Sequence, residues 1–572
     1  MAPTATAPTP PNTDVLIDQI RDSVIGERRI IPGPFGPRPL VYADFIASGR
    51  SLDMIEGAIR DKVLPTYGNT HTETSYTGRH TTALREEARS VIAKAVGATD
   101  AHTVIFTGNG ATAAVDRLVR GMEIEKKART GNAPIVFVGP YEHHSNDLPW
   151  RESGAIVERI ALTSSGQIDL THLAERLEAH QDATLKIGAF SAASNVTGVR
   201  TDLTAMSKLL HQNNAVLICD YAAAAPYVDM RLSLDAHDPL ARIDAIVYSS
   251  HKFIGGPGAS GVLIADKALF TSDRPGVTGG GTVSYVTADH HTYVHDIARR
   301  EEAGTPGIIG DIRAGAVMAL KQAIGSTEIE AREHAIMTTA FTRLAQASNV
   351  DILGPKDMGR IGILSFNISN QGQHLHYGFV VALLNDLFGI QARGGCSCAG
   401  PYAHDLLQIS NQSAAQFEDV VSKGQSLMRP GWVRLGFNYF FDEQTIDYIV
   451  SAILFISENG LRFLADYDVD VSQGLWRHKT GTADAPASLK DFWLHKSEAK
   501  QAEFQQLNTF LTTARDLALT RDVPRMKHSA ILGSKSDALR SFWMPQDMLP
   551  HPEQSHDASP PPPQPNSPAR AS

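Results

Sequence analysis

The sequence predicts an α/β fold, with a large domain built on a mostly parallel sheet flanked by helices and a smaller α+β domain after it. The runs 103–107, 134–138, 186–190, 215–219 and 243–248 are almost continuously apolar, as in strands buried on both faces. Stretches between them, such as 113–123 and 203–213, have helical spacing of apolar residues. Strands that alternate with helices favour a parallel sheet covered on both sides.

In the smaller domain the predicted strands and helices no longer alternate regularly along the sequence. Strands are expected at 362–368 and 432–437 and helices at 379–388 and 443–458, the last with Asp442 as N-cap and Gly460 as terminator. We therefore predict this division: a disordered Pro/Thr-rich end (1–12), an N-terminal segment (13–40), the large domain (41–310), the small domain (311–470), a helical extension with an amphipathic helix at 498–519 (471–545), and a disordered Pro-rich tail (546–572).

Composition narrows the class of protein. The chain has 572 residues, of which 42% are hydrophobic and 20% charged, and a net charge of −10 that disfavours nucleic acid as a partner. Three cysteines exclude a disulfide framework and fit a reducing compartment. No stretch approaches the roughly twenty apolar residues that span a bilayer, and the N-terminus lacks the basic and apolar regions of a signal peptide. We expect a cytoplasmic enzyme without a membrane partner.

Lys252 is the first candidate for chemistry. The tripeptide Ser250-His251-Lys252 follows a buried strand and precedes a glycine cluster at 255–258. Burial disfavours the ammonium form, so a lysine there is a better nucleophile near neutral pH. That is what pyridoxal phosphate requires of the amine with which it forms a Schiff base. A lone His-Lys pair is more often a surface feature, and the interpretation depends on other segments.

Two of those segments suit the phosphate and the ring of such a cofactor. Residues 108–112 follow one strand and open a helix, so backbone N–H groups and the Thr112 hydroxyl can hold a phosphate; a plain glycine turn is the alternative. Asp220 follows another strand and precedes four small residues at 222–225. Its carboxylate can pair with a protonated pyridine nitrogen, although strand-end aspartates are common.

His143 and Asn195 also follow strands. The imidazole of His143 can stack on a pyridine ring, and Asn195 can hydrogen-bond the cofactor's phenolic oxygen or the substrate. The neighbouring His144 raises metal binding as an alternative. Adjacent histidines point apart in regular structure, however, and no HExxH or CxxC partner occurs. We predict no metal site.

The glycine-rich loop 393–401 carries Cys396 and Cys398. This CxC spacing fits half a metal site, a redox pair, or one nucleophile with a neighbour, and simple packing in a turn is the alternative. A four-cysteine cluster is excluded because Cys219 is the only other thiol. A loop thiol near Arg393 would have its pKa lowered toward the thiolate.

Taken in order, these segments resemble the class V aminotransferase family of fold-type I pyridoxal phosphate enzymes, in its cysteine desulfurase and selenocysteine lyase branch. The similarity runs from about 42 to 438. It rests on segments that match the family's sequence blocks, which lie at 42–48, 69–71, 142–150, 194–198, 249–252, 279–281 and 303–306.

The resemblance implies a role for each matched position. Lys252 would form the Schiff base and carry the substrate's α-proton, His143 would stack on the ring, and Asp220 would pair with its nitrogen. Family members are homodimers that share active sites. The phosphate would contact Ala111, Thr112, Ser249 and His251, with Thr305 from the partner; Arg434 and Asn195 would bind the substrate, and Cys398 would be the nucleophile.

The expected reaction converts cysteine to alanine and leaves a persulfide on Cys398, with a sulfur-acceptor protein as a further partner. A C–S β-lyase or a class V aminotransferase would use Lys252 without a cysteine nucleophile, and a non-catalytic scaffold relative is the alternative of another class. Three departures bear on the choice: Ala223 stands where many desulfurases have glutamine, Cys396 stands where the family loop has histidine, and the stretch 401–434 is long.

Overall fold

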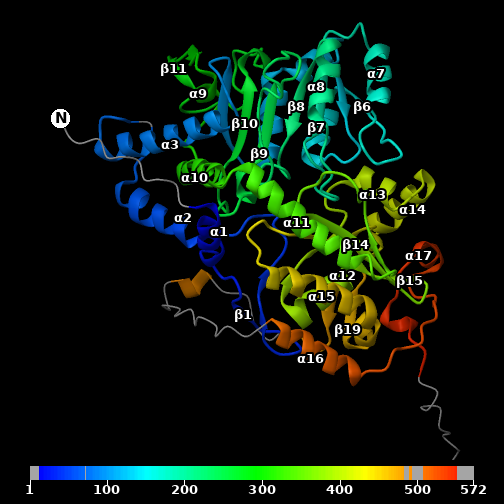
Figure 1. Ribbon diagram of the computed structural model, residues 1–572. Coiled ribbons are helices and arrows are strands. Elements are labelled where there is room, and N and C mark those ends of the chain that lie inside the picture. The colour runs from blue at the N-terminus through cyan, green and yellow to red at the C-terminus, as the bar shows by residue number, and fades with distance from the viewer. Residues whose placement is uncertain (1–11, 71, 482–488, 493–506, 551–572) are drawn as a thin grey trace, which may run out of the picture.

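The computed structural model describes residues 12–70, 72–481, 489–492 and 507–550 (Figure 1). Its larger sheet has seven strands in the order β4-β10-β9-β8-β7-β5-β6. Four of the six strand pairs are parallel, and the two antiparallel pairs both involve β10. This confirms the predicted mostly parallel sheet. The strands are β4 (His102–Gly108), β5 (Ile135–Val138), β6 (Ile156–Arg159), β7 (Lys186–Ser191), β8 (Ala215–Asp220), β9 (Ala245–Ser249) and β10 (Gly261–Asp266).

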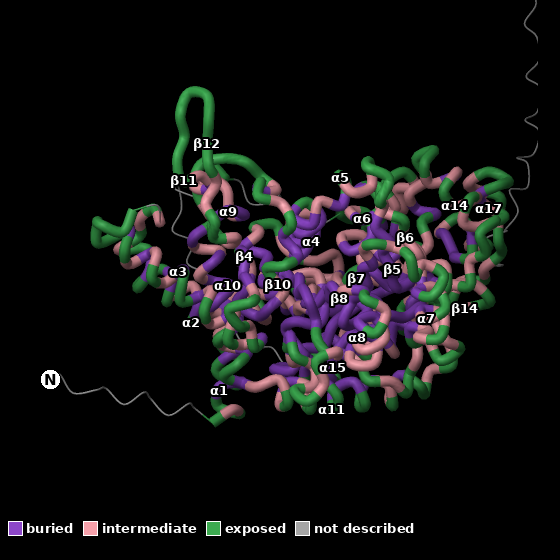
Figure 2. The backbone as a smooth tube through the Cα atoms, turned by 90° about the horizontal axis from the view of Figure 1, so that it is seen from above, coloured by how far each residue is buried: buried purple, intermediate pink, exposed green. Residues whose placement is uncertain are grey.

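Helices cover both faces of this sheet. As a result, successive residues along a strand are buried in two different apolar clusters, one on each face. Ile246 and Tyr248 belong to one cluster, and Val247 between them belongs to the other. In Figure 2 the strands of this sheet are largely purple, the colour of buried residues, as this cover on both faces requires. The helices of this part are α2 (Asp53–Ala58), α3 (Tyr76–Ala95), α4 (Gly110–Gly121), α5 (Ile124–Arg129), α6 (Leu148–Glu152), α7 (Leu170–Ala179), α8 (Leu203–Gln212), α9 (Ile297–Glu301) and α10 (Ile308–Ile324).

The smaller sheet is antiparallel. It runs in the order β13-β14-β18-β17, with β15 also paired to β14. Its strands are β13 (Val350–Ile352), β14 (Ile363–Asn370), β15 (Gln373–Leu375), β17 (Arg393–Gly395) and β18 (Trp432–Gly436). The helices packed around it and beside it are α11 (Ser326–Leu344), α12 (Tyr377–Phe388), α13 (Gly400–Leu406), α14 (Asn411–Ser422) and α15 (Glu443–Asn459).

Helix α15 starts as predicted, because the Asp442 side chain accepts a hydrogen bond from the Thr445 backbone N–H at 2.8 Å. The α-helix also ends at the predicted terminator, with Gly460 as its C-cap, but this glycine does not reverse the chain. Gly460 has right-handed dihedrals and begins a 3-10 helix, Gly460–Asp466. A Cβ at this position would lie 2.8 Å from Leu375 Cδ1, so close packing explains the glycine.

Several contacts cross the predicted divisions of the chain. Strand β3 (Val41–Tyr42) pairs in parallel with β16 (Ile390–Gln391), so the first residues assigned to the large domain join the later region. The hairpin β19 (Tyr467–Asp470) with β20 (Leu475–His478) lies across position 470. The extension is therefore not purely helical. Its described helices are α16 (Asn508–Leu519), which covers the described end of the predicted 498–519 helix, and α17 (Ser534–Leu539).

The two predicted disordered ends lie mostly outside the described residues, as does His71 of the matched 69–71 segment. Where they are described, they are ordered. Asn12 caps α1 (Thr13–Asp22) by accepting from the Asp14 N–H. Asp547 is buried and accepts from Arg540 at 2.5 Å and from the Ser529 N–H at 2.9 Å. A buried ion pair thus fixes positions 546–550, which the composition alone placed in the tail.

One helical stretch, Glu443–Asp466, is long and apolar enough to cross a membrane by length and composition, contrary to the sequence-based count. About two thirds of its most apolar window, 67%, is buried inside the protein. That burial is what a central helix of a packed domain requires. Elsewhere in the fold, β1 (Ile30–Ile31) pairs with β2 (Arg38–Pro39), and the hairpin β11 (Val283–Val286) with β12 (His291–Tyr293) projects from the surface (Figure 2).

Candidate active site

A cavity of about 840 Å³ lies beyond the carboxyl ends of β7, β8 and β9, where ligands bind in parallel α/β sheets. The smaller sheet closes its other side through residues of β17 and β18. Ten of the eleven predicted site residues line this one cavity: Ala111, Thr112, His143, Asn195, Asp220, Ser249, His251, Lys252, Cys398 and Arg434.

Lys252 ends the 3-10 turn Ser250–Lys252 directly after β9. The side chain is half-buried in the cavity wall. Burial lowers the pKa of Lys252 from 10.5 to about 8; the Asp220 carboxylate opposes this shift, and Arg434 and Arg393 add to it. At pH 7 about a tenth of the amine is therefore neutral. The structure thus supplies a nucleophilic amine at the predicted position.

Asp220 is the last residue of β8 and is 4% exposed. Its carboxylate accepts a hydrogen bond from the Ala222 N–H at 2.7 Å. Burial raises the pKa of Asp220, against the lowering effects of that bond and of Lys252. A buried carboxylate of this kind is stabilised by a cationic partner.

His143 faces the cavity with its ring orientation fixed. Its Nδ1 accepts from the Ser145 backbone N–H at 3.1 Å, so the neutral ring carries its proton on Nε2. Burial, with a further effect from the Lys252 charge, lowers the pKa of His143 to about 4. Ser145 also contacts the Thr112 hydroxyl at 2.6 Å, which links the ring to the start of α4.

The first turn of α4 opens on the cavity. Its N-cap residue, Asn109, makes no side-chain hydrogen bond to the helix, so the positive helix end keeps free donors. The Ala111 N–H donates to Ser249 Oγ at 2.9 Å. Burial lowers the pKa of the adjacent His251 to about 4. The hydroxyls and N–H groups here form a donor set suited to a phosphate.

Arg434 and Asn195 form the next part of the wall. Arg434 is 3% exposed; it donates to the Asn195 carbonyl at 3.0 Å and pairs with Asp44 at 3.2 Å. Its Nε has no hydrogen-bond partner among the described residues, and neither does the buried Oδ1 of Asn195. Buried polar atoms are rarely left unpaired. Both atoms therefore suit a ligand.

Cys398 lies in a tight turn between β17 and α13. Ser397 and Cys398 both have left-handed backbones, with φ of +55° and +57°, which is costly for residues other than glycine. The turn is held from the other wall: Asn195 Nδ2 donates to the Ser397 carbonyl at 2.7 Å and the His144 N–H donates to the Cys398 carbonyl at 3.0 Å. Cys398 lines the cavity, whereas Cys396 does not.

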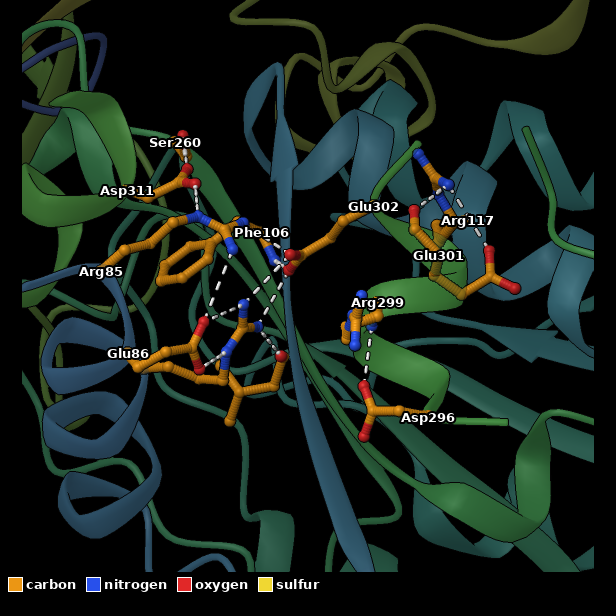
Figure 3. Close-up of polar contacts among 12 residues, drawn as sticks. Arg85, Glu86, Phe106, Arg117, Ser260, Asp296, Arg299, Glu301, Glu302 and Asp311 are labelled. Atoms are coloured by element: carbon orange, nitrogen blue, oxygen red, sulfur yellow. Dashed lines mark hydrogen bonds and ion pairs between the residues drawn. The ribbon is translucent and has the colours of Figure 1, made fainter. Parts of the chain in front are cut away.

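Thr305 is the predicted residue that does not reach this cavity. It is exposed, although the residues directly after it, 306–310, line the wall. The segment before it is anchored by the ion pairs in Figure 3. Glu302 accepts from Arg85 at 2.5 Å and from the Phe106 N–H at 2.8 Å, and Arg85 also pairs with Asp311 at 2.7 Å.

The residue-by-residue prediction missed three polar groups. Asp44 holds Arg434, and Arg393 lies directly opposite Arg434 in the β17–β18 pair and lines the cavity. Glu142, beside His143, is buried and accepts from Ser191 Oγ at 2.6 Å; burial raises its pKa to about 7. Asp44 and Glu142 lie within segments that match the family's sequence blocks, at 42–48 and 142–150. That position in the sequence was the signal that could have identified them as site residues.

Comparisons with known proteins identify the family of this chain. Residues 41–449 match the model of the family described as aminotransferase class-V. A probable cysteine desulfurase of Halalkalibacterium halodurans is 29% identical over 64% of this chain and 85% of its own length. A cysteine desulfurase of Dickeya dadantii is 28% identical over 66% of this chain and 88% of its own.

Solved structures show the same fold. A cysteine desulfurase from Thermococcus onnurineus superimposes with a TM-score of 0.61 at 23% identity, over 73% of this chain and 95% of that chain. One from Escherichia coli gives a TM-score of 0.59 at 23% identity, over 76% and 97%. The family match ends at 449, so the hairpin β19–β20 and the helices α16 and α17 lie beyond it. Because the family model covers well over half of its length, this chain belongs to the class V aminotransferase family and is an enzyme of that family.

Proposed function

We propose that this enzyme uses pyridoxal 5'-phosphate to take sulfur from cysteine, forming alanine and a persulfide on Cys398. The observation that carries the proposal is the single cavity lined by Lys252, Asp220, Arg434 and Cys398. A β-lyase or an aminotransferase requires the first three residues but has no use for a thiol in the cavity wall.

The residues present fit the cofactor. The donor set at the start of α4, with Thr112, Ser249 and His251, suits its phosphate, and Asp220 suits a protonated ring nitrogen. The unpaired Asn195 Oδ1 is a further buried polar atom that a ligand would satisfy. The family relationship supports the same cofactor. When bound, pyridoxal phosphate supplies an electron sink for carbanion chemistry at the substrate's α-carbon.

Lys252 binds the cofactor and carries the proton. With a pKa of about 8, its Nζ is neutral often enough near pH 7 to accept the α-proton and to return a proton later. His143 stays neutral at these pH values because its pKa is about 4, and its neutral ring carries the proton on Nε2. Arg434, oriented by Asp44 and Asn195, binds the substrate carboxylate through its guanidinium.

Cys398 takes the sulfur. Its thiolate attacks the substrate sulfur, an S–S bond forms as the carbon–sulfur bond breaks, and the bonding electrons remain with the carbon. That carbon takes a proton and the product is alanine. The hydrogen bonds from Asn195 and His144 to the turn carbonyls fix the backbone while the sulfur reacts.

The proposal includes a homodimer with shared sites, because the exposed Thr305 lies beside the cavity wall without entering this chain's own cavity. It also includes a cytoplasmic location, supported by three free cysteines. A sulfur-acceptor protein stays a prediction.

Product analysis tests the reaction. The purified enzyme, loaded with pyridoxal phosphate and given L-cysteine with a dithiol, should release alanine and sulfide in equal amounts. Cys398→Ser should abolish both while keeping the cofactor absorbance. Formation of pyruvate and ammonia by the enzyme and the variant alike would instead indicate a β-lyase, and a keto acid formed with amino transfer would indicate an aminotransferase.

A further inference from the structure

The second thiol of the cysteine turn has no role in the reaction above. Cys396 and Cys398 are both half-buried and free, with one residue between them. The Ala399 N–H donates to the Cys396 carbonyl at 3.2 Å, and the two residues between have left-handed φ. The chain thus reverses at the cysteine pair.

This turn places the two residues within bridging range. Two residues of fully extended chain span about 7 Å between Cα atoms, and a turn shortens that span. Disulfides form between Cα atoms about 4.4–6.8 Å apart. Cys398 lines the cavity, while Cys396 lies outside it and packs against the apolar core. The Cys396 thiol is therefore a neighbour of Cys398 that takes up no space in the substrate cavity.

The backbone around the pair is anchored on both sides. Asn195 holds the Ser397 carbonyl and His144 holds the Cys398 carbonyl, at 2.7 Å and 3.0 Å. The Gly400 N–H also donates to His144 Nε2 at 3.4 Å. With the peptide groups fixed, rotation of the Cys396 side chain is the movement that brings the sulfurs together.

We propose that Cys396 is a second catalytic residue, which attacks the Cys398 persulfide and releases hydrosulfide as a Cys396–Cys398 disulfide forms. The inference rests on the proposed function, because that reaction supplies the persulfide. It would make the enzyme a source of inorganic sulfide that needs no acceptor protein.

The step balances without an added oxidant. A persulfide sulfur is already at the oxidation level of a disulfide. The Cys396 thiolate attacks the inner sulfur, which is Cys398 Sγ; a new S–S bond forms, the bond to the outer sulfur breaks, and hydrosulfide leaves with the electron pair. A dithiol reductant then returns both cysteines to thiols. A disulfide across so short a turn is strained and therefore easily reduced.

A limited turnover tests this step. The holoenzyme is given one equivalent of L-cysteine in the absence of thiols, and alanine, sulfide and the mass of the tryptic peptide 394–423, which holds both cysteines, are measured. We expect one sulfide per alanine and a peptide that has lost two hydrogens. In Cys396→Ser we expect the same alanine, no sulfide, and one sulfur atom retained on Cys398.

Two outcomes are separable. Alanine formation with the persulfide retained on wild-type Cys398 would overturn this inference and leave the desulfurase proposal standing. Absence of alanine from both proteins would overturn the proposed function and, with it, this inference.

A redox titration gives a readout independent of turnover and of the variant's folding. Wild-type protein equilibrated with increasing ratios of oxidised to reduced glutathione, a couple oxidising enough for a strained disulfide, should convert peptide 394–423 to the form lacking two hydrogens in a single two-electron transition. A peptide that keeps both thiols at every ratio would contradict the inference, because the turn would then be unable to close the bridge.

Discussion

The two walls of the cavity are built in different ways. On the sheet side, Asp220 is the last residue of β8, and Lys252 ends the short turn that follows β9. Each is therefore positioned by the strand that carries it. On the cysteine side, Cys398 lies in a strained turn whose carbonyls are held by Asn195 and His144, about 200 and 250 residues away in the sequence. The first wall depends on local structure and the second on long-range contacts.

This difference separates two parts of the proposed chemistry. Cofactor binding and proton transfer belong to the sheet wall, whereas acceptance of sulfur belongs to the turn. A substitution in one wall should therefore affect one readout, cofactor absorbance or sulfur transfer, more than the other. Asn195 is the exception, because its side chain holds the turn through Nδ2 and offers the cofactor cavity a buried Oδ1 that has no partner among the described residues.

The largest effect is expected from Lys252→Ala, which removes the amine of the sheet wall. Activity should fall at least about a thousandfold, and the absorbance of the cofactor adduct should disappear. Lys321→Met is a matched control: burial also lowers the pKa of Lys321 to about 8, but this side chain donates to the Val228 carbonyl and is not part of the cavity lining. Borohydride trapping that labels Lys321 in place of Lys252 would refute the assignment.

Asn195→Ala should damage both walls together. It removes the hydrogen bond to the Ser397 carbonyl and the buried Oδ1, and each lost contact is equivalent to about tenfold. We expect cofactor affinity to fall by about that factor, as measured by absorbance titration, and alanine formation to fall further. A loss confined to one readout would mean that Asn195 serves one wall.

The pH dependence tests the sheet wall alone. A lysine with its pKa lowered to about 8 is protonated below that pH and neutral above it. The rate at which the apoenzyme forms its adduct with pyridoxal phosphate should therefore rise about fivefold between pH 7 and 8, reach about tenfold by pH 9, and level off above that pH. Stopped-flow absorbance measures this rate. A rise that continues to pH 10 would indicate an ordinary lysine.

Support for the cysteine wall can be tested with two tryptophans of the C-terminal extension. Trp476 Nε1 donates to His376 Nδ1 at 2.9 Å, and the same imidazole holds the Leu427 carbonyl, in the segment that links α14 to β18, at 3.2 Å. Trp543 Nε1 donates to the Asn370 carbonyl at 2.7 Å, at the end of β14. Each Trp→Phe change should cost about 1 kcal/mol of unfolding free energy.

The two variants should differ in one measurement. Trp476→Phe should raise the alkylation rate of Cys398, by at most about fivefold, the equivalent of 1 kcal/mol, and Trp543→Phe should leave it unchanged. Equal rates in both variants would mean that the extension does not support the turn.

The smallest effect is expected from Ser397→Gly. Glycine adopts the left-handed backbone without the steric cost that serine has at φ +55°. Relief of about 1–2 kcal/mol of backbone strain exceeds the loss of about 0.5–1 kcal/mol that a glycine causes through the freer unfolded chain. The free energy of unfolding, measured by denaturant titration, should therefore rise by at most about 1 kcal/mol. A decrease would show that the turn is not strained at this position.

The same contrast explains how far the sequence could predict the site. Strand-end residues such as Asp220 were predictable, because an apolar run and the polar residue after it are neighbours in the chain. The pairing of β3 with β16 was not, since it joins segments about 350 residues apart. Nor was the left-handed conformation of Cys398, because only the surrounding contacts favour it over the ordinary conformations of a cysteine.

The central claim is that the thiol of one wall takes sulfur from a substrate bound at the other. Rapid quenching of the Cys396→Ser holoenzyme, in which no second thiol can attack the persulfide, within its first turnover of L-cysteine, followed by alkylation and mass spectrometry, tests it directly. We predict one additional sulfur atom on Cys398 for each alanine formed. Product formation with Cys398 unmodified at every quench time would contradict the account.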